Sequence, residues 1–200
     1  MLFNPTMKYD FVPSLTLDSI SLETVDEMKL LGLTIRSDLS WKSNTSNLIM
    51  RAYKKLWAIK RLKNQGAELN DLVDIYMKQV RSVLEFGVPA WNSGITQAKV
   101  LDIERVQKSF LHIALGHEYL DYQSALRISN LETLSLRRLK LCKKFAEKAS
   151  KHPKHLKWFV MTKPGLNTKS DKQTYKMPIC RLARTSKGPI PYLTNLLNTK

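Results

Sequence analysis

The stretch RSVLEFGVPAWNSG, residues 81–94, decides the architecture of the chain because it interrupts a long amphipathic pattern. Apolar and aromatic side chains alternate there with Gly87 and Pro89, and both residues break a helix: glycine for its backbone freedom, proline for its missing N–H. The stretch holds one carboxylate and no cluster of catalytic residue types. We therefore expect a packed corner that joins two helices.

The aromatic side chains of this corner have two interpretations, packing between helices or stacking on nucleic-acid bases. Stacking platforms usually lie beside basic residues, and no basic residue occurs between Arg81 and Lys99. Packing of Phe86, Val88 and Trp91 between the neighbouring helices is the simpler interpretation.

Amphipathic patterns of helical period extend on both sides of the corner. Upstream, they predict one helix that runs to about Lys63 and stops near Gly66, and a second over residues 69–84. Downstream, Thr96 can cap a third helix, a short helical piece follows, and a last long helix starts near Thr133. The apolar face of the first helix is expected to comprise Leu48, Ile49, Ala52, Tyr53, Leu56 and Trp57.

The two ends of the chain differ from this helical middle. Residues 27–35, EMKLLGLTI, have the period of a strand, in which Gly32 would let another backbone come close, and the residues before them resemble edge strands. Residues 152–200 are basic and end in an apolar hook, residues 184–198, which is expected to dock either on the body of the protein or on a missing partner. The expected fold is mainly α: a bundle of about four to five helices (42–151), a small β hairpin before it (1–41) and a largely irregular basic tail (152–200).

The charge of the chain points to a polyanionic partner. Lys and Arg number 33 against 17 Asp and Glu, a formal net charge of +16. Repulsion between so many positive charges destabilises the folded chain unless an anion neutralises them. Nucleic acid is therefore the first partner to consider. Arg51, Lys54, Lys55 and Arg61 share the polar side of the first helix, which is either a solvated face or a phosphate-contacting one.

A second basic stripe is expected on the last helix. Arg137, Lys140, Lys144 and Lys148 recur at helical spacing on its polar side. Arg138 falls in the apolar arc, where a lone charge is costly, so we expect a carboxylate such as Glu104 or Asp121 to pair with it.

Residue types that carry chemistry are sparse. Cys142 and Cys180 are 38 positions apart without a CxxC pair, and the four histidines match no zinc-ligand spacing. Phosphate-binding glycine loops, a nucleophile elbow and an Asp-Asp pair are absent from the sequence. We expect no catalytic site, no metal and no cofactor. No signal peptide or run of 18 apolar residues is found, and an intracellular, reducing compartment fits best.

Six segments in this order resemble the C-terminal part of the reverse transcriptases of non-LTR (LINE, jockey-like) retrotransposons. The likeness covers almost the whole chain. The segments are EMKLLGLTIRSDLSW, AYKKLWAIKRLK, YMKQVRSVLEFGVPAWNSG, IERVQKSFLHIALG, ETLSLRRLKLCKKFA and GPIPYLTNLLN.

The resemblance implies a thumb-like module that binds an RNA, DNA or hybrid duplex through its backbone. Residues 29–35 look like the primer-grip hairpin, and Leu31 and Gly32 are expected to be primer-grip residues. The family's catalytic motif lies upstream of the palm strand similar to MLFN, so this sequence is expected to be an incomplete RNA-directed DNA polymerase. The residues expected to contact nucleic acid are Lys29, Arg36, Arg51, Lys54, Lys55, Arg61, Arg137, Lys140, Lys144 and Lys148.

Two alternatives stay open. The chain could be a protein-interaction module, in which Leu30, Leu31, Leu33 and the apolar hook dock on a palm domain or another partner. It could also be a mobile-element remnant without a role.

Overall fold

The structure is a computed structural model that describes residues 14–162, 174–181 and 183–199. It is mainly helical, with two small antiparallel sheets near the N-terminal end, as the sequence predicts. The strands are β1 (Thr16–Leu17), β2 (Ile20–Ser21), β3 (Glu27–Leu30) and β4 (Leu33–Arg36). The larger helices are α1 (Lys42–Asn64), α5 (Gln97–Leu115), α7 (Leu134–Ser150) and α9 (Pro189–Asn198). Shorter ones are α2 (Leu69–Ile75), α3 (Ser82–Leu84), α4 (Val88–Trp91), α6 (Tyr122–Ile128) and α8 (Ala183–Ser186).

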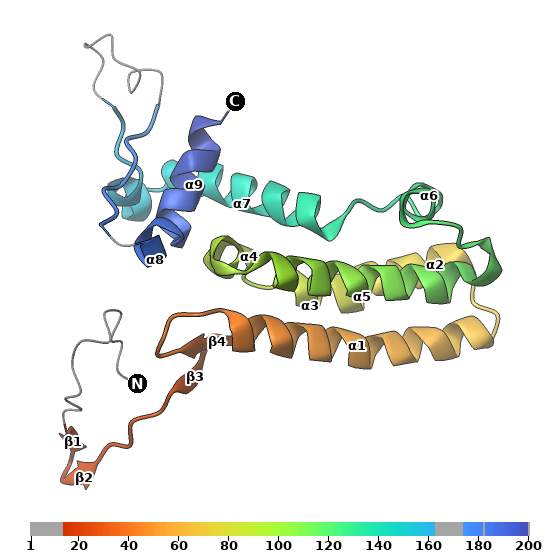
Figure 1. Cartoon of the computed structure of the whole chain (residues 1–200), viewed down its shortest axis with the longest axis horizontal. Helices are drawn as coiled ribbons and strands as arrows, with labels where there is room; N and C mark the ends of the chain where they lie inside the picture. The colour runs from red at the N-terminus through yellow and green to blue at the C-terminus, as the bar shows by residue number, and fades with distance from the viewer. Residues whose placement is uncertain (1–13, 163–173, 182, 200) are drawn as a thin grey trace.

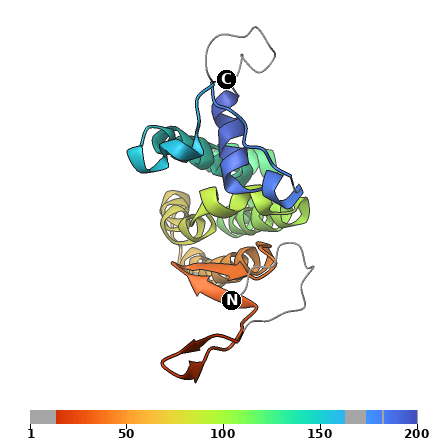
Figure 2. The ribbon, with the colours of Figure 1, turned by 90° about the vertical axis from the view of Figure 1, so that its left-hand side faces the viewer.

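The helices stack in layers (Figures 1 and 2). Helix α1 forms one outer layer, α5 lies beside the α2–α3 rod in the middle, and α7 with α9 forms the opposite layer. Each helix turns an apolar stripe toward this stack: α1 buries Leu48, Ala52, Leu56 and Ile59 at a spacing of three to four residues. Only one side of α1 is therefore packed, and the other side faces solvent.

The middle layer is centred on an aromatic pair. The rod predicted over residues 69–84 is continuous, but a π-helical segment, η1 (Tyr76–Arg81), joins α2 to α3. The buried ring of Tyr76 stacks on Phe110 of α5 with ring centroids 4.1 Å apart, and its hydroxyl donates to Gln107 Oε1 at 2.8 Å. Because the buried hydroxyl has a partner, the pair fixes the two rods without an unsatisfied polar group.

The corner at residues 81–94 forms as predicted. Gly87 has a φ of +64°, which separates α3 from α4, and Val88 and Trp91 are fully buried. The Trp91 indole N–H donates to the carbonyl of Phe86 at 2.8 Å and so closes the corner on itself. Phe86 differs from the expectation: it stays half exposed, because it turns toward the β3–β4 hairpin and not toward the helices.

The segment 27–35 is not the single strand that its alternation predicts. It folds back between Leu31 (φ +47°) and Gly32 (φ +86°), so β3 and β4 pair as a hairpin in which Lys29 lies opposite Thr34. Alternation with a period of two continues through a tight two-residue turn and therefore does not show where the chain reverses. A Cβ at Gly32 would come 2.9 Å from the Phe86 ring, so an aromatic ring approaches this glycine closely where a backbone was expected.

The apolar hook of the C-terminal region is helix α9, and it docks back on the body of the protein. It packs on α7 and α4, burying Leu193, and Asn92 Nδ2 donates to the Tyr192 hydroxyl at 3.1 Å. Of the two alternatives that the sequence allowed for the hook, docking on the body is therefore the one observed. Part of the predicted basic tail, residues 163–173, lies outside the described residues.

Candidate nucleic-acid interface

The outward side of α1 is the most cationic helix surface with no internal ion pair. The 23 residues of α1 include no Asp or Glu, and seven are basic: Lys42, Arg51, Lys54, Lys55, Lys60, Arg61 and Lys63. None of them lies within ion-pair distance of a carboxylate in the part of the chain that the structure describes. We call the solvent-facing side of this helix, with its exposed cations Lys42, Arg51, Lys54, Lys60 and Arg61, the α1 face.

The predicted contact residues of α1 lie on or beside this face. Arg51, Lys54 and Arg61 are exposed, whereas Lys55 lies at its edge, half-buried, with Nζ 3.0 Å from the Gln79 side-chain oxygen. Because a lysine bound to a neutral amide keeps its whole charge, all four side chains contribute positive potential to the same side of the molecule.

Aromatic side chains also lie on the α1 face, which contradicts the expectation that Tyr53 and Trp57 pack inward. Trp57 is 62% exposed and Tyr53 is 41% exposed. The guanidinium of Arg61 lies over the Trp57 ring, 4.9 Å from its centroid, within the range of a cation–π interaction. The apolar stripe centred on Ala52 is narrower than the sequence suggested, and at 100° per residue Trp57 falls on the far side from it.

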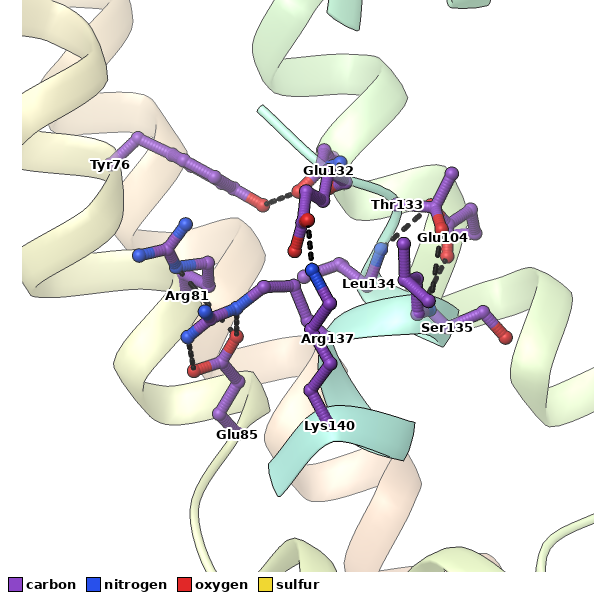
Figure 3. Close-up of polar contacts among 12 residues, drawn as sticks. Tyr76, Arg81, Glu85, Glu104, Glu132, Thr133, Leu134, Ser135, Arg137 and Lys140 are labelled. Atoms are coloured by element: carbon purple, nitrogen blue, oxygen red, sulfur yellow. Dashed lines mark hydrogen bonds and ion pairs between the residues drawn. The ribbon is translucent and has the colours of Figure 1, made fainter. Parts of the chain in front are cut away.

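The basic stripe of α7 is partly neutralised by acidic residues of other elements (Figure 3). Arg137 forms a bidentate ion pair with Glu85, with N–O distances of 3.0 and 3.1 Å, and the same carboxylate lies 3.7 Å from Arg81. Hydrogen bonding to Glu85 raises the pKa of Arg137. Lys140 is paired with Glu132, and this hydrogen bond lowers the pKa of the Glu132 carboxyl.

The remaining two cations of this stripe, Lys144 and Lys148, are exposed, and neither forms an ion pair with another described residue. The stripe thus offers two free charges of the four predicted. Lys144 and Lys148 lie in the C-terminal half of α7, and α7 forms the layer opposite α1 (Figure 1). The two basic surfaces predicted from the sequence therefore do not meet in one continuous site.

Among the described residues, the hairpin contributes one cation that forms no ion pair. Lys29 of β3 is exposed, whereas Arg36 of β4 pairs with Glu27 and with Asp38, whose carboxylate oxygen lies 3.2 Å from Nε. Hydrogen bonding from Ser43 and Arg36 lowers the pKa of Glu27. At the turn, Leu31 is 89% exposed and Gly32 is covered by Phe86. The turn of the hairpin is thus apolar and projects into solvent, whereas the charge of Arg36 at the other end of the hairpin is neutralised by its ion pairs.

The prediction that a carboxylate such as Glu104 or Asp121 pairs with Arg138 is wrong. Arg138 is only 2% exposed, its Nε donates to the Asn92 side-chain oxygen at 3.1 Å, and its Nη1 has no hydrogen-bond partner. Glu104 accepts from the backbone N–H groups of Leu134 and Ser135 at the start of α7 (Figure 3), and Asp121 caps α6. Both carboxylates satisfy unpaired N–H groups of helix ends instead. Burial lowers the pKa of Arg138.

Comparison of the chain with protein-family models, with curated proteins and with solved structures finds no match. None of the described helices combines the length and apolarity needed to cross a membrane. Over the described ranges, no group of three or more His, Cys, Asp or Glu is arranged to hold a metal ion.

Proposed function

We propose that this chain is a thumb-like, nucleic-acid-binding module that holds the backbone of a duplex without reading its sequence, and that it does not polymerise by itself. Helix α1 carries the proposal: seven cations, five of them exposed, no carboxylate on the helix, and no ion pair to the described residues around it. Lysine and arginine side chains of this kind bind nucleic acid by displacing the counterions that are condensed on its phosphates.

The dimensions of α1 suit this role. At a rise of 1.5 Å per residue the helix is about 35 Å long, which is close to one helical turn of B-form DNA. Its exposed cations are spread over this length and not gathered at one end, since Lys42 lies in the first turn and Arg61 in the last. Such spacing favours contact with successive phosphates over contact with one base pair.

Assignment to the thumb of a non-LTR reverse transcriptase rests on the resemblance of the six ordered segments. The arrangement that accompanies them supports it: a hairpin, then a long cationic helix, then a packed corner and further helices. In such an enzyme the chemistry belongs to the palm, and a thumb contributes grip on the duplex. The proposed module would accordingly bind RNA, DNA or hybrid duplexes and would need the palm and fingers of a polymerase for synthesis.

The test is the salt dependence of binding to duplexes of unrelated sequence, measured by fluorescence anisotropy with the full chain. If about four exposed cations of α1 contact phosphates, log K should fall against log salt with a slope of about −3.6. Affinities for different sequences should agree within about twofold at each salt concentration, as backbone contacts predict. A flat salt response, or a strong preference for one sequence, would reject the proposed function.

A second function, docking of a partner domain at the hairpin, is favoured by the exposed leucines there. Leu31 projects into solvent at the turn, and Leu17 and Ile20 of the β1–β2 sheet are also exposed. Several exposed apolar side chains of this kind are a feature of interaction sites. It predicts self-association or partner binding that persists at high salt and is lost in Leu31→Asn, a change that also suits the positive φ of that residue.

A further inference from the structure

Three planar side chains follow one another along the α1 face. Tyr53, Trp57 and Arg61 are spaced i, i+4 and i+8, so they lie on one side of the helix over about 12 Å. We call this row the α1 ladder. The guanidinium of Arg61 covers part of the Trp57 ring at 4.9 Å from its centroid, yet the indole remains 62% exposed. The ladder is thus a preformed π surface in solvent.

Cations lie on both sides of the ladder. At 100° per residue, Lys54 and Lys60 are about 60° from Trp57 in opposite directions around the helix. Both are exposed, and neither pairs with a carboxylate among the described residues. An aromatic ring between two unpaired cations combines a stacking surface with charges that can hold the flanking phosphates.

Contacts with the backbone of a duplex would not involve the ring of Trp57. In a fully paired helix the interior bases are stacked on one another, so their faces cannot reach a side chain on the outside. Unpaired bases have free faces, and stacking on them is tolerant of sequence because every base has one. The exposed indole therefore indicates a ligand with unpaired bases.

Charge argues against an apolar partner for the ladder. Interface cores between proteins are depleted in lysine, whereas α1 places Lys54 and Lys60 directly beside Trp57 and has no acidic residue to offer a basic partner. The exposed apolar part of this helix is small, consisting of Met50, Ala58 and the two aromatic rings. Such a narrow stripe between cations matches an anionic polymer with planar groups.

We propose that the α1 ladder stacks unpaired bases, so that the α1 face takes single-stranded nucleic acid, or the unpaired strand next to a duplex. This deepens the proposed function and rests on it, because the same lysines would hold the phosphates. One base lies on Trp57 and its neighbour on Tyr53, while Lys54 and Lys60 contact the phosphates on either side.

The experiment measures binding of the full chain to a 12-residue single-stranded oligothymidylate and to a blunt 12-base-pair duplex, for wild type and Trp57→Leu. Leucine keeps an apolar side chain but has no π face. We expect roughly tenfold weaker binding of the single strand, a change of less than about twofold for the duplex, and an unchanged salt slope. Trp57→Phe should recover most of the lost affinity.

The matched control is Trp158→Leu, which removes another partly exposed indole, in the short 3₁₀ segment η4 (Pro153–Trp158) at the end of α7. It should leave both affinities unchanged. Equal single-strand affinity of wild type and Trp57→Leu, with normal salt-dependent duplex binding, would overturn the stacking proposal alone. Loss of salt dependence for both ligands would reject the proposed function itself. Tighter binding to vesicles of phosphatidylcholine and phosphatidylserine (7:3) than to either oligonucleotide would overturn the ladder as a base site.

Discussion

Helices α1 and α7 carry cations at similar helical spacing, but the two helices differ in how many of these cations are paired with carboxylates. The cations of α1 meet no carboxylate within ion-pair distance among the described residues, whereas on α7 Arg137 pairs with Glu85 and Lys140 with Glu132. The cations of α1 thus stay without an ion pair to any described residue. Helix α7 uses half of the predicted stripe to hold the fold together.

The difference arises from neighbouring elements and not from the helices themselves. Glu85 lies at the end of the α2–α3 rod, 52 positions before Arg137, and Glu132 lies just before α7. In the part of the chain that the structure describes, no other helix lies against the outer side of α1 (Figures 1 and 2). Whether a basic stripe can bind an anion therefore depends on the residues that lie opposite it, and the sequence of the helix alone does not show them.

The largest effect that we expect comes from charge reversal on α1. Arg51→Glu, Lys54→Glu and Arg61→Glu together should weaken duplex binding on the order of a hundredfold at 0.15 M salt and lower the salt slope by about 3, since each lost phosphate contact costs roughly fivefold. The measurement is anisotropy across a salt series.

Its matched control reverses three cations of α7, Lys140, Lys144 and Lys148, which changes the net charge by the same amount. These changes should weaken binding by less than about tenfold, since only two of the three charges are free. Equal losses in the two triple variants would mean that net charge governs binding and that the α1 face has no special part.

The second expected effect concerns the paired cations and is one of stability. Glu85→Ala should lower the free energy of unfolding by about 2 kcal/mol, because the largely buried carboxylate bonds Arg137 through both oxygens and also lies near Arg81. Urea unfolding measures it.

Asp74→Ala is the control for this prediction. It removes an exposed pair with Lys78 at i, i+4, which is worth only about 0.3–0.5 kcal/mol. If the two variants lose equal stability, the Glu85 bridge contributes no more than a surface ion pair does.

Helix positions were predictable from the sequence because periodicity and end signals are local. Thr96 accepts from the Lys99 N–H as a cap, as expected, and Gly116 ends α5 with a positive φ. The turn inside residues 27–35 was not predictable from alternation, and Leu31 is an unusual residue for a positive φ.

The candidate site was predicted less completely, because it depends on contacts between distant elements. The charges of α1 were correctly placed on its polar side, but the exposure of Trp57 was missed. A signal was present: Leu48, Ala52, Leu56 and Ile59 already complete an apolar stripe at ideal spacing, so Trp57 was not needed to fill it. No local pattern signals the pairing of Arg137 with Glu85 across 52 positions.

The third prediction contrasts two adjacent arginines of α7. Arg138 is buried, with a neutral amide as its hydrogen-bond acceptor and an Nη1 without a partner. Arg138→Met should therefore stabilise the protein by about 1 kcal/mol, since a buried guanidinium that forms no ion pair with a described residue is replaced by an apolar side chain of similar length. Asn92 keeps its bond to the Tyr192 hydroxyl. Arg137→Met should destabilise the protein, because it breaks the ion pair with Glu85. A loss of stability in both variants would contradict the absence of an ion pair at Arg138.

The smallest expected effect is the pH dependence of the Glu132–Lys140 pair. The folded protein holds the pKa of Glu132 below its ordinary value, chiefly through the Lys140 hydrogen bond, so the pair stabilises the fold above the unfolded pKa of about 4.3. This contribution is lost as the pH falls through the lower, folded pKa. Wild type should therefore be slightly more stable than Glu132→Gln at pH 7, by less than the Glu85 effect, and the two should converge near pH 2.5 in urea unfolding. A gap that is unchanged at low pH would mean that the side-chain shape of Glu132, and not its charge, provides the stability.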